Sequence, residues 1–137
     1  MSRRQTATLI VMSALGLGLV TAFAPSQERG FIEKGRRLYV RHCAACHGID
    51  GKGNGPAAAS LKTPPPDLTR LQPEGEAFPI YRVMNVIEGE KVVPAHGSRE
   101  MPIWGTIFRR AHGEALMRSD IYALARYLEA IQAKRSP

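Results

Sequence analysis

The residues Cys43-Ala44-Ala45-Cys46-His47 have the types and the spacing needed to attach a haem. Each cysteine sulfur can add to one vinyl group of the porphyrin, and the histidine directly after Cys46 can then ligate the iron through one ring nitrogen. Bound in this way, the haem is both the cofactor and a part of the apolar core. The pattern therefore predicts one covalently attached haem c, with Cys43 and Cys46 as attachment points and His47 as the first iron ligand.

Three other kinds of site use cysteines at this spacing, and each needs something that the chain lacks. A structural zinc site needs about four Cys or His ligands in paired clusters, but His42, His96 and His112 are scattered. A thioredoxin-like dithiol lies near a βαβ pattern, and no β-branched runs alternate with helices here. A disulfide between Cys43 and Cys46 would close a loop too short to stabilise an exported domain much. We therefore favour haem.

The second iron ligand is predicted to be Met101. A carrier needs both axial positions filled, and methionine raises the reduction potential relative to a second histidine. Met101 is held extended by Pro102, and Trp104 beside it is expected to exclude water. Met84 falls on the apolar face of a predicted helix, and Met117 leads into another, so we expect both in the core or at the surface.

His96 is the alternative ligand, because imidazole also ligates haem and gives a lower potential. It lies in a stretch, Pro94-Ala95-His96-Gly97-Ser98, that is typical of a solvated turn. A third alternative is an enzyme or gas sensor whose sixth iron position stays open. Such a site needs a distal acid/base pair, for which only His96 with Arg99 and Glu100 is available.

The elements that must position these residues are predicted to be helices, with no strand among them. Apolar residues recur at three- and four-residue steps in four segments, of which the third is the weakest. These are residues 31–43, residues 79–88, residues 106–118 with an interruption at Gly113, and a last helix that begins at the N-cap Ser119, has Asp120 in its first turn and ends near Lys134 and Arg135. Gly35 costs the first helix about 1 kcal/mol relative to alanine, so we expect another helix to cross there at close range.

Residues 48–69 are predicted to form a long ordered loop. Four glycines and the run Pro64-Pro65-Pro66 cannot sustain a helix or a sheet. Loops of this length are usually functional. We expect this one to wrap the haem edge, with Leu61 and Leu68 turned inward.

The first 24 residues have the pattern of an export signal. The start Ser2-Arg3-Arg4 is basic, residues 7–24 are apolar or small almost throughout, and Ala22-Phe23-Ala24 matches an A-x-A cleavage signal. Pro25 is an awkward residue for a peptidase, and the apolar run reaches the lower limit for a membrane span. Residues 1–24 are therefore predicted to be a signal peptide or, alternatively, an uncleaved membrane anchor. A linker over 25–30 and one domain over 31–134 follow, outside the cytoplasm.

The charge of the chain favours acidic partners. Lys and Arg number 19 against 12 Asp and Glu, which gives a formal net charge of +7. Such a surplus speeds association with acidic docking surfaces and makes it sensitive to salt. Candidates for a docking rim are Lys34, Arg36, Arg37, Arg41, Lys52 and Lys62. Nucleic acid is not expected, because no basic run is interleaved with aromatic residues.

From about Gly35 to Ile131, the sequence resembles a class I c-type cytochrome of the bacterial mono-haem kind. The resemblance implies the all-α cytochrome c fold, in which three to four helices and long loops wrap one covalently bound haem. In this family the first and last helices cross beside the haem through a small residue and aromatic or apolar side chains. Gly35 with Tyr39, and Leu124 with Tyr127, occupy those places.

The same resemblance implies roles for residues near the iron and for the whole chain. Pro56 would offer its carbonyl to the second ring nitrogen of His47, and Met101 with Trp104 matches the family's axial methionine loop. The family implies a periplasmic one-electron carrier between a redox donor and an acceptor, not an enzyme. However, the 54-residue gap between His47 and Met101 is more similar to cytochrome domains of respiratory oxidases and dehydrogenases. A membrane-tethered subunit of such a complex is therefore the alternative.

Overall fold

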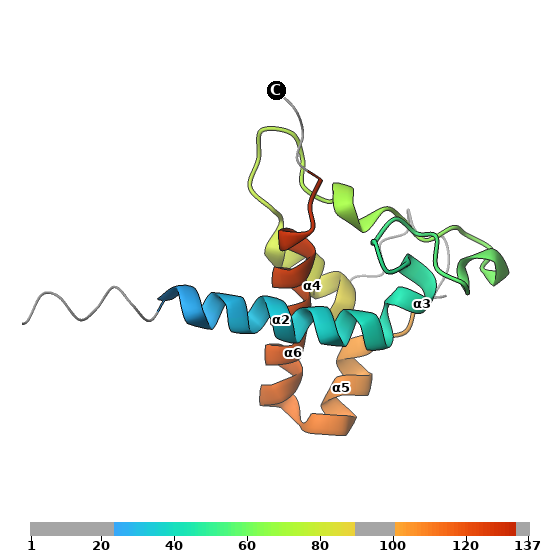
Figure 1. Cartoon of the computed structure of the whole chain (residues 1–137). Coiled ribbons are helices and arrows are strands. Elements are labelled where there is room, and N and C mark those ends of the chain that lie inside the picture. The colour runs from blue at the N-terminus through green and yellow to red at the C-terminus, as the bar shows by residue number, and fades with distance from the viewer. Residues whose placement is uncertain (1–23, 90–100, 134–137) are drawn as a thin grey trace, which may run out of the picture. The chain divides into compact units, whose positions relative to one another are not determined.

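The regular elements are all helices in the computed structural model, which describes residues 24–89 and 101–133. Along the chain they are α2 (Ala24–His42), α3 (Ala44–His47), the 3-10 turns η1 (Ala58–Ser60) and η2 (Leu68–Arg70), α4 (Ile80–Glu88), α5 (Trp104–His112) and α6 (Glu114–Ala130) (Figure 1). The described residues include no strand, which confirms the all-α prediction. The predictions for residues 1–23, for His96 and for Lys134 and Arg135 lie outside the described residues.

The first helix begins earlier than predicted. α2 begins at Ala24 and not at Phe31, so the expected linker over 25–30 is helical. Pro25 suits the first turn, where its missing N–H has no helical partner to lose. The contacts divide the chain into two units, residues 1–30 and residues 31–137. None of the helices in the described part of the chain is long and apolar enough to cross a bilayer.

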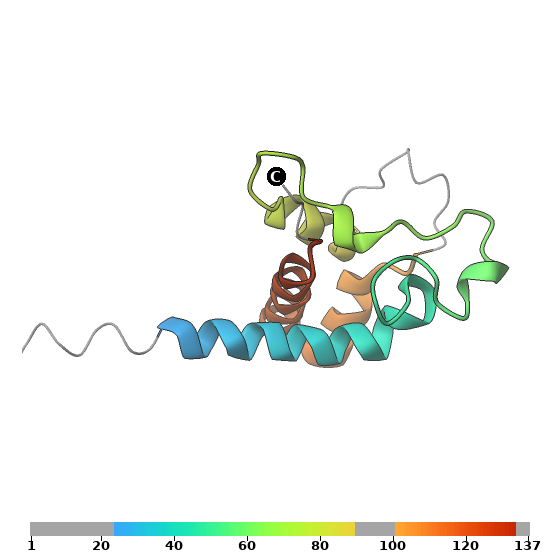
Figure 2. The same cartoon turned by 45° about the horizontal axis from the view of Figure 1, so that its top comes forward.

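α2 and α6 cross at Gly35. A Cβ atom at this residue would collide with the backbone carbonyl of Ala123 and with Cβ of Tyr127, so the approach requires glycine. One turn further along α2, the rings of Tyr39 and Tyr127 lie with their centroids 5.2 Å apart, and Leu124 is buried beside them. Figures 1 and 2 show the crossing from two directions. The crossing that the glycine and the family resemblance predicted is therefore confirmed.

The boundary between α5 and α6 differs from the prediction. α6 begins at Glu114 and not at Ser119. Gly113, where an interruption was predicted, ends α5 with a φ of 82°, a conformation that favours glycine. The residues after it belong to α6 and not to the preceding helix. Ser119 lies inside α6, and its hydroxyl accepts a hydrogen bond of 2.9 Å from Lys34 Nζ rather than capping the helix.

The core is built on α6, against which α4 and α5 pack. The largest fully buried side chains are Tyr39, Phe108, Met117, Ile121 and Leu124. Met117 is thus a core residue, and Met84 packs partly buried against the core. α4 agrees with the prediction, and Gly89 ends it in the left-handed conformation with a φ of 86°.

The segment after α3 is the predicted long loop, with the turns η1 and η2 as its regular structure. Leu68 packs partly buried against the core, as expected, and Leu61 is half-buried. The Asp67 carboxylate caps η2 by accepting hydrogen bonds from the Thr69 N–H at 2.8 Å and the Thr69 hydroxyl at 2.6 Å. These contacts stabilise the turn η2 from within the loop.

Candidate functional site

The haem motif lies where α2 ends and the four-residue helix α3 begins. The Cys43 N–H donates to the Tyr39 carbonyl at 2.8 Å, and the His47 N–H donates to the Cys43 carbonyl at 2.9 Å. Cys43 and Cys46 are therefore one helical turn apart, which places both thiols on the same side of the turn. His47 follows at the end of α3. This is the arrangement that two bonds to one porphyrin edge and an adjacent iron ligand need.

The His47 side chain is buried and suited to hold a metal. The residue is 9% exposed, and its Nδ1 atom has no hydrogen-bond partner among the described residues. Burial lowers the pKa of His47, because the charged ring is poorly solvated, and the Pro66 carbonyl opposes that shift as an acceptor. The Pro66 carbonyl is thus close to the ring, although Nδ1 makes no hydrogen bond to a described residue. The ring is neutral at pH 7, the form that ligates metals.

The structure places the Pro66 carbonyl near the His47 ring, and the role of Pro56 that the family resemblance implied stays a prediction. The turn after the motif explains the position of Pro66. The Gly53 N–H donates to the His47 carbonyl at 2.8 Å, and a Cβ at Gly53 would collide with the Pro65 carbonyl. The proline run therefore packs directly on the turn that follows the histidine, and this brings the Pro66 carbonyl to the ring.

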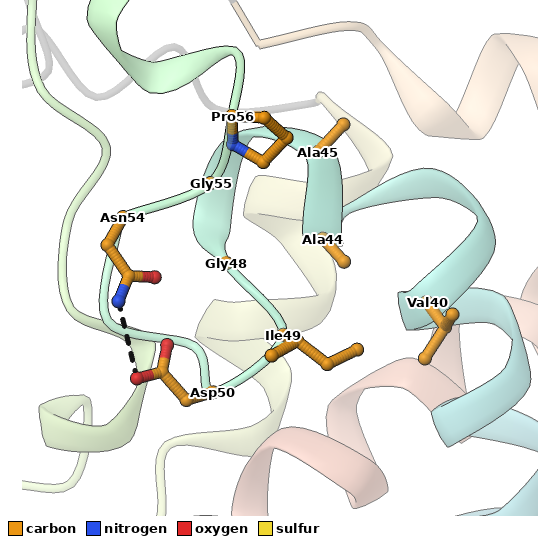
Figure 3. A pocket seen from close by; sticks show the side chains of 9 residues that line it. All are labelled: Val40, Ala44, Ala45, Gly48, Ile49, Asp50, Asn54, Gly55 and Pro56. Carbon is orange, nitrogen blue, oxygen red and sulfur yellow. Dashed lines mark hydrogen bonds between the residues drawn. The ribbon is translucent and has the colours of Figure 1, made fainter.

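Pro56 lies in the wall of a pocket formed by the first part of the loop and the end of α2. The pocket is lined by the two alanines of the motif, Gly48, Gly55, and the side chains of Val40, Ile49, Asp50 and Asn54 (Figure 3). Neither cysteine nor His47 contributes to this wall. The pocket therefore shares the two alanines with the motif but lies beside its cysteine and histidine side chains.

The state of the two cysteines argues against a redox dithiol. Both are half-buried and neither forms a disulfide. Burial raises the pKa of the Cys43 thiol to about 12, with a smaller effect from Cys46. A dithiol oxidoreductase needs the opposite, a thiol whose pKa is lowered. Among the residues described, no three His, Cys, Asp or Glu side chains gather as a metal-binding group.

Trp104 and Met101 lie where the chain enters α5. Trp104 is half-buried, with its ring 5.2 Å from that of His42 and stacked at 5.6 Å on Phe108. It joins the start of α5 to the end of α2, directly before Cys43. Met101 lies in the bend before α5 and is 39% exposed. Its role as an iron ligand remains a prediction.

An ion pair between α2 and α6, with a buried carboxylate, was not predicted from the sequence. Asp120 is 5% exposed, and its two carboxylate oxygens lie 2.7 Å from Lys34 Nζ and 3.0 Å from His112 Nδ1. Lys34 had been placed on the docking rim and Asp120 at a helix N-terminus. The position of Lys34 could have indicated the pair, because Lys34 directly precedes Gly35, where the two helices cross. A charged group buried at a helix crossing requires a partner of opposite charge.

Comparison with known families agrees with this geometry. The family model described as Cytochrome c matches residues 32–132, a stretch that includes the cysteine motif, the glycine crossing and the methionine loop. A search of curated proteins and a search of solved structures each gave no match. Proteins of this family are typically electron carriers rather than enzymes, and a Cys-x-x-Cys-His motif holds their haem c. The chain therefore belongs to the cytochrome c family.

Proposed function

We propose that this chain is a mono-haem carrier whose iron is held by His47 and Met101, with Cys43 and Cys46 as the attachment points. The observation that carries the proposal is the buried His47 ring, whose Nδ1 has no partner among the described residues and which faces the Pro66 carbonyl. A histidine in a metal site commonly uses one ring nitrogen for the metal and donates from the other to a backbone carbonyl. The burial and the carbonyl both fit that use.

The protein residues divide the work of the site. Bound haem c supplies one-electron chemistry, with iron passing between the ferrous and ferric states. His47 Nε2 would hold the iron, while the Nδ1 proton would be donated to the Pro66 carbonyl and would fix the orientation of the ring. Met101 would close the sixth position to oxygen and peroxide, and Trp104 would keep water away from it. The cysteines would prevent loss of the group.

Replacement of the proposed sulfur ligand tests this assignment. In the oxidised Met101→Ala variant, the sulfur-to-iron charge-transfer band should be lost, whereas Met84→Leu should retain it. Met84 is the matched control, because it packs against the core on α4. A Met101→Ala variant that keeps the band contradicts methionine ligation. An absent band and a high-spin spectrum in the parent protein would instead favour the open-site enzyme or sensor.

A mass measurement tests covalent attachment separately. The denatured protein should exceed the mass of its polypeptide by one haem, and replacement of both cysteines by alanine should abolish the difference. A parent protein with no added mass contradicts the attachment.

We also propose acidic redox partners, on the basis of the net charge of +7. Several of the residues expected to form the docking rim contribute less net positive charge than expected, because they form ion pairs. Arg36 and Arg37 pair with Glu33, and Lys52 pairs with Asp50. Arg41 is exposed directly before the motif. Oxidation by ferricyanide, an anion, should slow as ionic strength rises, whereas oxidation by a cationic cobalt complex should not. Equal salt dependence with both oxidants contradicts a basic surface near the haem.

The proposed location is the periplasm, either free or tethered to the inner membrane in a respiratory or dehydrogenase complex. The export pattern in residues 1–24 supports both forms. Fractionation of cells without detergent, followed by N-terminal sequencing, separates them. Release of a protein that begins near Pro25 supports the free carrier, and retention of Met1 in the membrane fraction supports the tethered subunit. Recovery in the cytoplasm contradicts both.

A further inference from the structure

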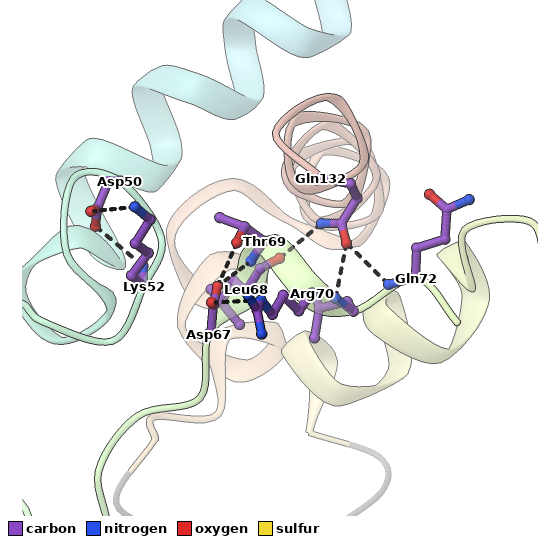
Figure 4. A network of polar contacts seen from close by, with 9 residues as sticks. Asp50, Lys52, Asp67, Leu68, Thr69, Arg70, Gln72 and Gln132 are labelled. Carbon is purple, nitrogen blue, oxygen red and sulfur yellow. Dashed lines mark hydrogen bonds and ion pairs between the residues drawn. The ribbon is translucent and has the colours of Figure 1, made fainter. Parts of the chain in front are cut away.

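The side chain of Gln132 clamps the loop that passes the haem motif onto the end of α6. Its Oε1 accepts hydrogen bonds from the N–H groups of Leu71 at 2.9 Å and Gln72 at 3.0 Å. Its Nε2 donates to the carbonyls of Leu68 at 2.8 Å and Leu128 at 2.7 Å. Figure 4 shows the amide directed at η2. All four hydrogen-bonding positions of the side-chain amide are therefore used.

A continuous set of contacts leads from this clamp to His47. The Leu68 N–H donates to the Gly51 carbonyl at 2.7 Å, which joins η2 to the turn after the motif. A Cβ at Gly53 would collide with the Pro65 carbonyl and lie 3.5 Å from the Pro66 carbonyl oxygen, and the Gly53 N–H donates to the His47 carbonyl at 2.8 Å. The segment that carries Pro66 past the ring is thus fixed on both sides.

The stiffness of this segment determines how a movement of η2 would be transmitted. Each proline ring fixes its own φ near −65° and also restricts the residue before it. Few backbone dihedral angles in the run Pro64-Pro65-Pro66 can therefore change when Leu68 moves, so the run moves with Leu68. A second bond, from the Ala133 N–H to the Thr69 carbonyl at 2.9 Å, holds η2 to the same end of α6. The position of the Pro66 carbonyl thus depends on how α6 holds η2.

We propose that Gln132 is a positioning residue, which holds the Pro66 carbonyl against the His47 ring and thereby lowers the reduction potential of the haem. The inference rests on the proposed function, in which His47 ligates the iron. A ring N–H that donates to a carbonyl makes the imidazole a stronger electron donor, and this favours ferric over ferrous iron. Without the clamp, the carbonyl moves away from the ring, the histidine donates less, and the potential rises.

The test compares Gln132→Met with Gln72→Met in the haem-loaded protein. Methionine has a similar length and removes all four hydrogen bonds of Gln132. Gln72 is the matched control, because its side chain bonds within the loop, to the Glu76 carbonyl at 2.7 Å, and its backbone N–H still meets Gln132. Optical redox titration should show that Gln132→Met favours ferrous iron about threefold to tenfold more than the parent. Tenfold corresponds to 59 mV for a one-electron couple.

Two proton measurements separate positioning from general destabilisation. The N–H protons of Leu71 and Gln72 should exchange faster in Gln132→Met, and so should the ring N–H proton of His47 in the ferrous protein. The inference is overturned if the two amides are freed while the potential and the ring proton stay as in the parent. It is also overturned if Gln72→Met raises the potential equally.

A shorter amide provides a second variant if Gln132→Met does not retain its haem. Gln132→Asn keeps the polar group but cannot span the same four partners, so the potential should rise in the same direction by a smaller factor. An unchanged potential in Gln132→Asn with freed amides contradicts the inference. The charge-transfer band of the parent protein reports separately on the ligands. If the parent protein shows the band and the variants leave the reduction potential unchanged, only the proposed role of Gln132 is refuted. If the parent protein lacks the band, the proposed iron ligands are refuted.

Discussion

Replacement of Gly35 by alanine tests whether the fold depends on the close crossing of α2 and α6. The added Cβ would meet the carbonyl group of Ala123 and, at 2.8 Å, Cβ of Tyr127. These atoms belong to the backbone of α6 and to the first carbon of a side chain, so no change of rotamer moves them away. The helices themselves must separate, or the substituted turn of α2 must shift.

Two opposing effects set the size of the change in the free energy of unfolding. Alanine gains about 1 kcal/mol over glycine from helix propensity, whereas overpacking a close contact costs about 1–3 kcal/mol. Because backbone atoms are involved, we expect a cost at the upper end, about 3 kcal/mol. The net loss is then about 2 kcal/mol. For a domain near 100 residues, this lowers Tm by about 8–16 °C.

Gly30 provides the matched control in the same helix. No atom of the described residues lies within 4 Å of a Cβ placed there, so Gly30→Ala should stabilise the protein by about 0.5–1 kcal/mol. Urea unfolding of the haem-loaded proteins, followed both by circular dichroism and by haem absorbance, measures both changes and tests two-state behaviour. A Gly35→Ala protein at least as stable as the parent, beside a stabilised Gly30→Ala, would refute the reasoning.

Two further predictions concern buried polar groups. Lys34→Met removes the lysine partner of the buried Asp120 carboxylate, so it should lower the free energy of unfolding in urea by about 1–3 kcal/mol. The control Arg118→Ala removes an exposed pair and should change that free energy by less than about 0.5 kcal/mol. Similar values for the two variants would contradict the argument from burial. Burial lowers the pKa of His42 below 6.5, so its contribution to stability is complete above that pH and is lost as the pH falls through the lowered value. The stability of His42→Gln should therefore fall less between pH 7 and pH 5, and an unchanged pH profile contradicts this.

The sequence predicted the features that depend on one residue type at one place. Gly35 indicated the helix crossing, because a glycine inside a helix is costly unless close approach requires it. Gly89 predicted the end of α4 for a similarly local reason, since its left-handed conformation excludes most other residues. The motif at Cys43 predicted the site, and the match over residues 32–132 agrees with it.

Features that depend on distant contacts were not predictable from local patterns. Gly113 indicated an interruption, but the local pattern favoured Ser119 as the N-cap and did not show that α6 begins at Glu114. The carbonyl beside His47 comes from Pro66, because the proline run packs on Gly53, a contact that spacing alone does not reveal. Asp120 looked like a first-turn residue until its pairing with α2 was seen.

The burial of Cys43 also bears on the order of events during maturation. With a pKa raised to about 12 by burial, the thiol is ionised to only about 1 part in 10⁵ at pH 7, and the thiolate is the nucleophile. A polypeptide that folds first would hold one of the two reacting sulfurs as an unreactive thiol, so bonding to the cofactor should be faster before the native structure closes. Iodoacetamide should accordingly label Cys43 of the folded, haem-free chain far more slowly than in urea. Folding of the haem-free chain would therefore slow haem attachment at Cys43, and attachment should be fastest while the chain is still unfolded.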